Sequence, residues 1–433
     1  MLRSQALTPR AAFAYLEERT QLGIKFGLET MSALSAELSH PEWSAPSLLV
    51  AGTNGKGSVC AFLEAGLRGA GLRTGLYTSP HLVRVNERIA VAGRPLSDRH
   101  LARALTAVRD AASSLLAQGR IPAHPTYFET VTLAAFWHFR EVRVDVMVLE
   151  VGLGGRLDAT NVADPLVSAV VSLDFDHEAF LGRTLAAIAR EKAGVMRAGR
   201  AVVLGPAPAE ARRALEQEAT KRRALLVDVE TRRGPSGGAS LPVLPLRGAH
   251  QRDNFRVAWR ILEEAQNAGL KLDLRKAARG MRHTRWRGRL ELLPGRPPLL
   301  LDGAHNPAGA RALAAYLRSA GPFVLVFGVM ADKDVAGLAR ELFPLARAVV
   351  LTRPRVGRAA TPENIAKATR GLSRRARLEP EPRKAIALAR RLARTGDTVV
   401  VAGSLYLVGE VLSFRRPRKW SRASGKSHSA TPR

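Results

Sequence analysis

A glycine-rich segment that contains a lysine and a serine has the residue types of a phosphate-binding loop. An apolar segment at 47–51 precedes GTNGKGS at 52–58, and a stretch of helical pattern follows. In such a strand–loop–helix arrangement, backbone N–H groups and the helix N-terminus surround phosphate oxygens, Lys56 supplies a mobile cation and Ser58 a hydroxyl group. The spacing departs from the usual Walker pattern, and a glycine turn without function is the alternative. The combination favours a nucleoside triphosphate site.

Further candidates follow two later apolar segments. Glu150 ends the segment 144–150 and begins EVGLGGRLDATN, and His177 comes shortly after the segment 166–172. Because the carboxyl ends of parallel strands converge on a ligand crevice, we expect Glu150 beside the phosphate loop, where it could hold Mg²⁺. His177 is a candidate for a second metal position, with an ordinary surface or core role as the alternative. Lys192, taken by itself, fits a solvated lysine.

Short β-branched segments that alternate with longer Ala/Leu/Arg-rich segments must position these side chains. The alternation begins at about residue 47 and is typical of βαβ units, so the sequence predicts an α/β protein with parallel sheets. Helices are expected in most of the gaps. The expected strands are 47–51, 73–77, 144–150, 166–172, 201–204, 299–301, 323–327, 348–351 and 398–401.

The densest Pro/Gly stretch, PGRPP at 294–298, is the expected domain linker, because restricted prolines make a stiff connector. RRGPSGGAS at 232–240 is the alternative boundary, but a helical pattern resumes near His250, which favours a surface loop there. The predicted organisation is therefore a first domain at 1–293, the linker at 294–298, a second domain at 299–414 and a basic, disordered tail at 415–433.

The composition limits the class of protein. The chain has 433 residues, 46% of them hydrophobic, and a formal net charge of +29. This length predicts two or three compact domains, and the charge suggests either polyanionic partners or an arginine-rich genome. Cys60 is the single cysteine, which excludes a disulfide framework and favours a reducing cytoplasm. The apolar segments are too short to cross a membrane, and we expect no membrane partner.

A set of motifs, taken together, resembles one family. In chain order they are GTNGKGS, TSPHL at 78–82, TYFE at 126–129, EVGLGGRLDATN at 150–161, DH at 176–177 with LG at 181–182, EKAGV at 191–195, DGAHNP at 302–307 and GSLYLVGE at 403–410. This order, over about residues 22–410, resembles the bifunctional bacterial folylpolyglutamate synthase and dihydrofolate synthase enzymes of the Mur ligase superfamily. LGIKFGLETM at 22–31 also looks like the family's entry to a pterin pocket.

The resemblance implies a fold and a reaction. The fold would be a P-loop-containing parallel-sheet ATPase domain, the Mur ligase-like central domain, followed by a smaller Rossmann-like α/β domain. ATP would phosphorylate a substrate carboxylate, and the amino group of L-glutamate would attack the acyl phosphate to give an amide, ADP and phosphate. The implied ligands are ATP, two Mg²⁺ ions, dihydropteroate, reduced folates and L-glutamate. We expect a monomer without a nucleic-acid partner.

The resemblance also assigns roles to individual residues. Ser79 and Glu150 resemble ligands of a first Mg²⁺ ion and His177 a ligand of a second, while Lys192 matches a lysine that is carbamylated in family members. A carbamate beside two Mg²⁺ ions would be stabilised by their charge, whereas an ammonium group would be repelled. The residues expected to bind the nucleotide are Gly52, Thr53, Asn54, Gly55, Lys56, Gly57, Ser58, Asn254, Arg289, Asp302, His305 and Ser404.

Two residues match positions that face the pteridine in the bifunctional enzymes. Phe128 could stack on the flat heterocycle and Asp158 could pair with ring nitrogens. Without the resemblance, a core aromatic at a helix start and an Asp cap are the alternatives. In the second domain, Asp302 and His305 resemble residues that reach ATP from the opposite side, with His305 as a donor or positioning group.

The sequence departs from the family pattern in two places. Trp286-Arg287-Gly288-Arg289 stands where the family commonly has Trp-Pro-Gly-Arg, so that two arginines compete for the phosphate role. Phe255 follows Asn254 where the family usually has a small residue. The alternatives to a bifunctional ligase are a ligase with one of the two activities, a Mur-type ligase acting on a cell-wall precursor, and a nucleic-acid-dependent ATPase.

Overall fold

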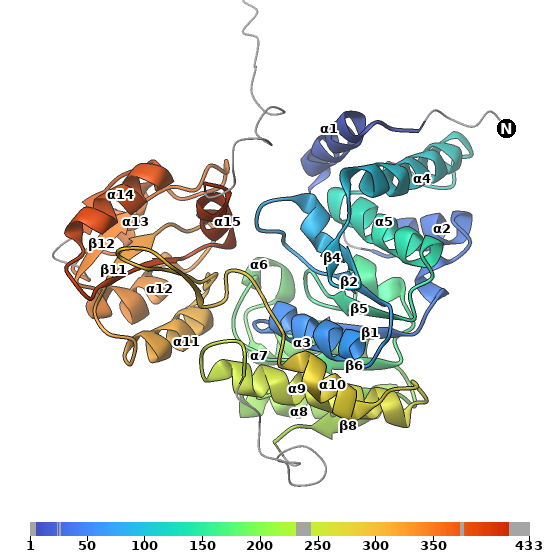
Figure 1. Ribbon diagram of the computed structural model, residues 1–433. Coiled ribbons are helices and arrows are strands. Elements are labelled where there is room, and N and C mark those ends of the chain that lie inside the picture. Colours follow the sequence, from blue (N-terminus) through green and yellow to red (C-terminus); the bar gives the residue numbers. More distant parts are fainter. Residues whose placement is uncertain (1–5, 24, 26, 231–243, 373–375, 415–433) are drawn as a thin grey trace, which may run out of the picture.

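The computed structural model describes residues 6–23, 25, 27–230, 244–372 and 376–414, and it contains two sheets that each belong to a separate α/β domain (Figure 1). The first sheet has the strand order β4-β3-β2-β5-β1-β6-β7-β8. Its strands are β1 (Ser47–Ala51), β2 (Thr74–Tyr77), β3 (Ile89–Val91), β4 (Arg94–Pro95), β5 (Val146–Glu150), β6 (Val167–Val170), β7 (Ala201–Leu204) and β8 (Leu225–Asp228). Pairing is parallel along β2-β5-β1-β6-β7-β8. At one edge, β3 pairs antiparallel with β2, and β4 pairs antiparallel with β3.

The central strands of this sheet are buried and largely apolar because helices cover both faces. Leu49 of β1 belongs to a core shared with residues of α4 and α5, whereas Leu48 belongs to a core shared with α3, α9 and α10. The helices of this domain are α1 (Pro9–Arg19), α2 (Glu29–Glu37), α3 (Lys56–Gly69), α4 (Asp98–Ala117), α5 (Tyr127–Glu141), α6 (Glu178–Leu181), α7 (Leu185–Lys192), α8 (Ala209–Arg222), α9 (His250–Asn267) and α10 (Leu274–Met281). The predicted return of helix near His250 is confirmed.

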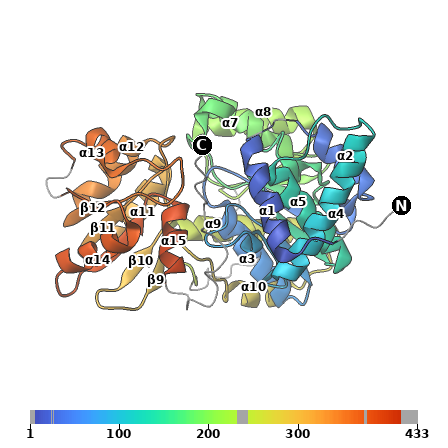
Figure 2. The ribbon, with the colours of Figure 1, turned by 90° about the horizontal axis from the view of Figure 1, so that it is seen from above.

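The second sheet has the order β13-β12-β11-β14-β10-β9 and lies beside the first domain in both views (Figures 1 and 2). Its strands are β9 (Glu291–Leu293), β10 (Leu299–Leu301), β11 (Phe323–Phe327), β12 (Ala348–Leu351), β13 (Ala376–Leu378) and β14 (Thr398–Ala402). The helices are α11 (Pro307–Leu317), α12 (Val335–Leu342), α13 (Pro362–Ala368), α14 (Pro382–Leu392) and α15 (Leu405–Ser413). All strand pairs are parallel except β9–β10.

The Pro-rich segment 294–298 is not the linker that the sequence predicts. Leu293 pairs with Leu299 across an antiparallel ladder, so that 294–298 is the loop of a hairpin inside the second domain. The chain therefore passes between the domains before β9, in the residues that follow α10. Prolines suit a hairpin loop as well as a linker because both leave backbone N–H groups unpaired, and composition alone could not separate the two.

The long parallel strands agree with the prediction, and the strands that it omitted are short or at edges. β1, β7, β10, β11 and β12 have the expected bounds, whereas β3, β4, β8, β9 and β13 were not expected. The alternative boundary at 232–240 and the basic tail at 415–433 lie outside the described residues. None of the helices in the described ranges has the length and apolar character that crossing a bilayer requires.

Candidate active site

A cavity of about 680 Å³ lies where the carboxyl ends of β1, β5 and β6 face the second domain. Residues from both sheets line it, so that its walls are complete only when the two domains are together. Every site residue predicted from the sequence lines this cavity: Gly52, Thr53, Asn54, Gly55, Lys56, Gly57, Ser58, Ser79, Phe128, Glu150, Asp158, His177, Lys192, Asn254, Arg289, Asp302, His305 and Ser404.

The phosphate loop leaves β1 and enters α3, as a strand–loop–helix motif requires. Gly55 has φ +84°, and a Cβ there would lie 2.3 Å from Oδ1 of Asn254, so that only glycine fits. A Cβ at Gly57 would lie 2.9 Å from the indole nitrogen of Trp286. The Lys56 ammonium group donates to the carbonyl oxygens of Gly52 (3.0 Å) and Thr53 (3.2 Å), which folds it over the loop.

Polar contacts tie this loop to the end of β6. The backbone N–H of Thr53 donates to the Ser172 carbonyl oxygen at 2.9 Å, and that of Asn54 donates to the Ser172 hydroxyl at 3.0 Å. Ser172 Oγ in turn donates to the Asn54 carbonyl oxygen at 2.9 Å. These contacts hold the loop backbone from within its own domain, at the end of a neighbouring strand of the same sheet.

Glu150 ends β5 beside the loop and offers a carboxylate to the cavity. Its Oε2 accepts a hydrogen bond from the backbone N–H of Ser79 at 2.9 Å, which brings two predicted metal ligands together. Burial raises the pKa of the Glu150 carboxyl group, and the Lys56 ammonium group partly offsets that shift. A bound cation would remove the cost of keeping this buried carboxylate ionised.

The donor set suits Mg²⁺ better than a metal that needs an all-protein cage. Among the residues that the structure describes, no group of three or more His, Cys, Asp or Glu side chains could hold an ion by itself. Mg²⁺ commonly takes one or two protein oxygens and completes its shell with water and substrate phosphates. Glu150 and Ser79 beside a phosphate loop fit that pattern.

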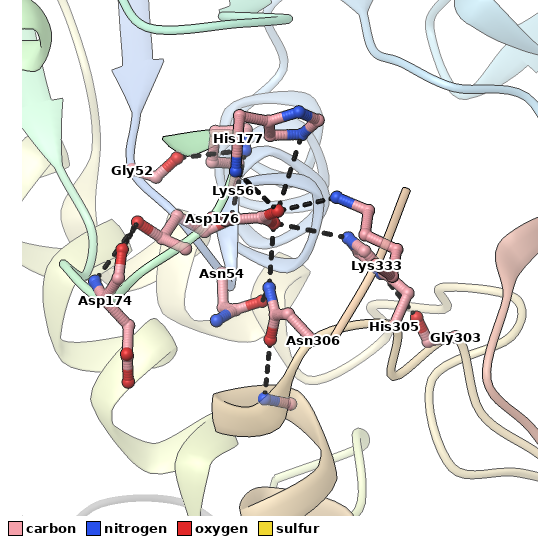
Figure 3. Close-up of polar contacts among 12 residues, drawn as sticks. Gly52, Asn54, Lys56, Asp174, Asp176, His177, Gly303, His305, Asn306 and Lys333 are labelled. Carbon is pink, nitrogen blue, oxygen red and sulfur yellow. Dashed lines mark hydrogen bonds and ion pairs between the residues drawn. The ribbon is translucent and has the colours of Figure 1, made fainter. Parts of the chain in front are cut away.

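Asp176 links the two domains at the centre of the site (Figure 3). Oδ1 accepts from the Lys333 ammonium group at 2.6 Å, and Oδ2 accepts from the Asn306 amide at 2.9 Å. The Nε2 atoms of His177 and His305 each lie 3.8 Å from one of the Asp176 oxygens. Burial would raise the pKa of Asp176, but His177, Lys333 and His305 outweigh it and hold that pKa well below its usual range. The carboxylate stays ionised at neutral pH.

His177 itself has a left-handed backbone conformation, φ +53°, at the start of α6. Burial lowers the pKa of its imidazole, although Asp176 opposes that shift. A neutral imidazole retains the nitrogen lone pair that metal coordination requires. The structure thus places His177 in the cavity in a form compatible with the predicted role.

Lys192 is buried at the end of α7 and is not the solvated lysine that its residue type suggested. Only 3% of the residue is exposed, and its Nζ donates to the Gly52 carbonyl oxygen at 3.0 Å. Burial, helped by the charge of Lys56, lowers the pKa of Lys192 to about 7. A substantial fraction of its amine is therefore neutral and nucleophilic near neutral pH.

Asp302 and His305 come from the loop after β10. The two Asp302 oxygens accept from the backbone N–H groups of Leu290 and Ala304, both at 2.9 Å, which fixes the segment that carries Arg289. His305 Nδ1–H donates to the Gly303 carbonyl oxygen at 2.8 Å, so that Nε2 faces the cavity. Burial lowers the pKa of His305 to about 4, although Asp176 opposes that shift.

Asp158 has a structural role that the pterin prediction did not include. One of its oxygens accepts from the backbone N–H groups of Gly152 and Leu153, and the other accepts from the N–H and hydroxyl of Thr160. The carboxylate therefore caps a short 3-10 helix, Ala159–Val162, and holds the GLGG turn. Phe128 forms the adjacent wall, 6.1 Å from the Tyr77 ring.

Neither departure from the family pattern, Arg287 or Phe255, contributes a side chain to the cavity wall. Arg287 is exposed and pairs with Glu291 at 3.2 Å, whereas Arg289 is half-buried and lines the cavity. Phe255 is buried in the core and packs edge-on against Phe62, away from the cavity lining. Of the two arginines, only Arg289 is therefore placed to contact a ligand in the cavity.

Two other predicted residues cap or brace the elements around the cavity. Asn254 donates to Oε1 of Gln251 at 3.0 Å, and Gln251 donates to the Ser58 hydroxyl at 3.3 Å, which ties α9 to α3. Ser404 caps α15 by accepting from the Tyr406 N–H at 3.1 Å. From the predicted pterin entry at 22–31, Gly23, Lys25 and Gly27 line the cavity, and residues 24 and 26 lie outside the described residues.

Lys333 and Asn306 are two site residues that sequence reasoning missed. Asn306 is 2% exposed, caps α11 and donates to both Asn54 and Asp176. It lies within the DGAHNP motif, so the sequence did contain a signal that could have identified Asn306 as a site residue. Lys333 follows β11 in a segment without any recognised motif, so only the structure brings it to the site.

Comparisons with known proteins agree with this architecture. Residues 288–405 match the family model described as Mur ligase, glutamate ligase domain, which begins before the Pro-rich hairpin loop. A Bacillus subtilis dihydrofolate synthase/folylpolyglutamate synthase is 31% identical over 422 residues, which cover 92% of this chain and 97% of that protein. The class that the fold and the site define is therefore the Mur ligases.

Solved structures extend the likeness to almost the whole chain. Escherichia coli FolC in complex with DHPP and ADP has a TM-score of 0.82 and 30% identity, covering 95% of this chain and 98% of that chain. Mycobacterium tuberculosis folylpolyglutamate synthase complexed with ADP has a TM-score of 0.85 and 31% identity, covering 95% and 100%. The chain belongs to the dihydrofolate synthase/folylpolyglutamate synthase family.

Some relatives are longer than this chain. A probable bifunctional folylpolyglutamate synthase/dihydropteroate synthase of Halobacterium salinarum is 36% identical over 435 residues, which cover 94% of this chain but only 51% of that protein. The chain thus spans about half the length of that relative, and the match identifies the family without assigning the relative's other half to this chain.

Proposed function

We propose that the chain is an ATP-dependent ligase that joins L-glutamate to dihydropteroate and adds further glutamates to reduced folates. One observation carries the proposal: a single cavity is lined by the phosphate loop of the first sheet and by Asp302 and His305 of the second, in a chain of this family. A related enzyme solved with Mn, AMPPNP and L-glutamate bound, at 32% identity, supports the same ligand classes.

The chemistry runs through an acyl phosphate. A carboxylate is a poor electrophile, and transfer of the γ-phosphoryl group of ATP turns one carboxylate oxygen into part of a leaving group. Lys56 would leave the loop carbonyls to contact the charge that accumulates on the phosphate oxygens. The amine of glutamate then attacks the acyl carbon, and the amide and inorganic phosphate are released. Walls from both domains would keep water away from the acyl phosphate.

Glu150 and Ser79 would hold one Mg²⁺ ion and His177 a second. The ions would supply positive charge to the phosphate oxygens during transfer. His305, with Nε2 directed to the cavity, would orient the phosphate from the opposite side, and Arg289 would bind phosphate as a fixed guanidinium group. Asn254 and Ser404 would contact the nucleotide, and Asp302 would position the Arg289 segment.

Lys192 would act as a carbamate in the loaded enzyme. Its neutral amine would add to CO₂, forming an N–C bond and releasing one proton, which gives a carboxylate-like group at the cavity wall. The buried position and the pKa of about 7 favour this reaction because an ammonium group has no lone pair for it. Phe128 and the segment held by Asp158 would form the pterin wall.

We also propose which domain binds which ligand, and where and in what oligomeric state the protein acts. The larger domain would bind ATP and the pterin, and the smaller domain would bind glutamate. The protein would act as a cytoplasmic monomer on small molecules, without nucleic acid. The positive charge of the chain would attract ATP, glutamate and folates, all of which are anionic.

ATP turnover and product masses test the proposal. Purified protein with Mg²⁺ and ATP should release phosphate when dihydropteroate and glutamate are both present, and mass spectrometry should detect dihydrofolate. Tetrahydrofolate in place of dihydropteroate should give products extended by glutamate. Extension without dihydrofolate formation, or the reverse, would identify a monofunctional enzyme. Turnover that depends on DNA or RNA and ignores both pterins would refute the proposal.

A further inference from the structure

Arg88 is a buried arginine in the cavity wall to which neither the motifs nor the proposed mechanism gives a role. It ends a 3-10 helix, Val85–Arg88, directly before β3, and it is only 9% exposed. Its carbonyl oxygen accepts from the backbone N–H of Thr78 at 2.9 Å. The main chain of Arg88 is thereby fixed next to Ser79, at the end of β2.

Two contacts orient the guanidinium group. Its Nε–H donates to Nδ1 of His81 at 2.9 Å, so that His81 acts as the acceptor. The guanidinium carbon lies 5.2 Å from the centre of the Tyr127 ring, in the range of a cation–π contact. One contact comes from the segment after β2 and the other from the start of α5. The His81 and Tyr127 contacts thus hold the guanidinium group between two segments of the cavity wall, the one that contains Ser79 and the one that contains Phe128.

In the part of the chain that the structure describes, the terminal nitrogens of Arg88 form no hydrogen bond or ion pair with a carboxylate; Glu150 lies near enough for the charge of Arg88 to lower its pKa, but the two groups are not paired. Buried arginines are ordinarily paired, because an isolated buried cation is costly. The remaining N–H donors of Arg88 form the rigid fork that binds a carboxylate with two parallel hydrogen bonds. A cavity-lining arginine that is nine-tenths buried, and whose terminal nitrogens are not paired with a carboxylate, is placed to receive an anion.

We propose that Arg88 binds the carboxylate of the folate substrate that is to be activated. This inference rests on the proposed ligase function and adds a substrate-binding residue to it. A pteroate whose ring lies at Phe128 must direct its carboxylate toward the phosphate loop. Arg88 contacts Tyr127, the neighbour of Phe128 in the chain, and its charge also acts on Glu150, which lines the same cavity. The fork would hold one carboxylate in line with the phosphoryl group and would then neutralise the acyl phosphate. His81 and Tyr127 act as positioning residues.

A comparison of two ligands in two proteins tests the contact. Dissociation constants are measured for dihydropteroate and for its analogue with hydrogen in place of the carboxyl group, each with Mg²⁺ and a non-hydrolysable ATP analogue present. In the wild type, loss of the carboxylate should weaken binding by about 10- to 100-fold, as expected for charge-assisted hydrogen bonds. In Arg88→Gln the two ligands should bind within about twofold of each other.

Arg84→Gln is the matched control. Arg84 precedes the same 3-10 helix, but its guanidinium group contacts Asp98 and does not line the cavity. This variant should discriminate between the two ligands as the wild type does. Arg88→Lys keeps the charge but loses the fork, so its discrimination should fall between the wild type and Arg88→Gln. Binding of the ATP analogue reports that each variant is folded.

The outcomes separate this inference from the proposed function. Equal discrimination by Arg88→Gln and the wild type overturns the role of Arg88 and leaves the ligase function intact. Failure of the wild-type protein to bind dihydropteroate overturns both. If Arg88→Gln does not fold, the Arg88→Lys protein decides, because undiminished discrimination by that variant contradicts a bidentate contact.

Discussion

The two walls of the cavity are built in different ways. The wall from the first sheet is braced within its own domain, since the loop at Thr53 and Asn54 is bonded to Ser172 at the end of the neighbouring strand β6. The facing wall reaches the first by a few side chains, of which Asn306 and Lys333 contact Asp176. The first wall is therefore set by the folding of one sheet, whereas the second depends on domain docking.

This difference predicts two kinds of mutational effect. Substitutions in the first wall should lower kcat while the shape of the cavity is retained. Changes in the second wall should alter how the domains meet and should leave the nucleotide loop intact.

Lys56→Ala should cause the largest loss, because it removes the one mobile cation on the phosphate loop without changing the backbone. We expect kcat to fall by about 10³-fold, in the range seen when a preorganised charge partner of a reacting group is lost. Steady-state phosphate release measures the effect, and circular dichroism checks the fold. Lys221→Ala, at the exposed end of α8, serves as the control. A Lys56→Ala enzyme with wild-type kcat would contradict the assignment of the loop.

Lys192 should give a dependence on both pH and bicarbonate. Because its pKa is lowered to about 7, the neutral amine that reacts with CO₂ increases as the pH rises through 7, and activity should rise with it. Degassed, CO₂-free buffer should reduce activity by about tenfold at pH 7, and bicarbonate should restore it. Isotopically labelled bicarbonate should give a carbamate NMR signal that Lys192→Met lacks. Activity indifferent to bicarbonate, without such a signal, would exclude the carbamate.

Lys333→Met should weaken domain docking rather than phosphate binding. The Lys333–Asp176 pair is 2.6 Å long with both side chains about nine-tenths buried, so its loss leaves a buried carboxylate short of a partner. We expect kcat/KM to fall about tenfold, with little change in the affinity of the protein for ADP, which the phosphate loop binds. Small-angle X-ray scattering should detect a larger radius of gyration. An unchanged radius together with unchanged kcat/KM would show that the pair does not hold the domains.

Substitution of the two arginines in the Trp286–Arg289 segment should have different effects on the KM for ATP, because only one of them lines the cavity. Arg289→Gln removes a cavity-lining cation, and we expect about a tenfold rise in KM for ATP. Arg287→Gln breaks only an exposed pair with Glu291, and a change below about twofold is expected. The Michaelis constants of the two variants, measured side by side, test the assignment. It would be reversed if Arg287→Gln were the more damaging change.

The parallel strands and the phosphate loop could be predicted from the sequence because their signals are local. Continuous apolar segments such as 323–327 predict strands buried on both faces, and GTNGKGS follows one of them directly. The hydrogen-bond partners of Asp158 and Asp302 were less accessible: the sequence offered a cap at Asp158 only as an alternative, and it did not indicate that Asp302 would accept from Leu290 and Ala304. Each carboxylate is bonded to backbone N–H groups, and sequence spacing does not reveal which backbone groups a side chain will meet.

The features that the sequence could not predict depend on contacts between distant segments. Glu291–Leu293 is too short to be recognised as a strand, and its pairing with β10 turns an expected linker into a hairpin loop. Lys333 and Asp176 are 157 residues apart and meet only because the domains dock. Likewise, the burial of Lys192 against the Gly52 carbonyl requires that α7 return to the start of the phosphate loop.

The central claim is that the cavity brings a folate carboxylate to the γ-phosphate of ATP. Dihydropteroate labelled with heavy oxygen in its carboxylate tests this claim directly, because an acyl phosphate leaves one carboxylate oxygen on the phosphate that is released. The mass spectrum of the inorganic phosphate should show one labelled oxygen for each dihydrofolate formed. Dihydrofolate formed together with unlabelled phosphate would contradict the account.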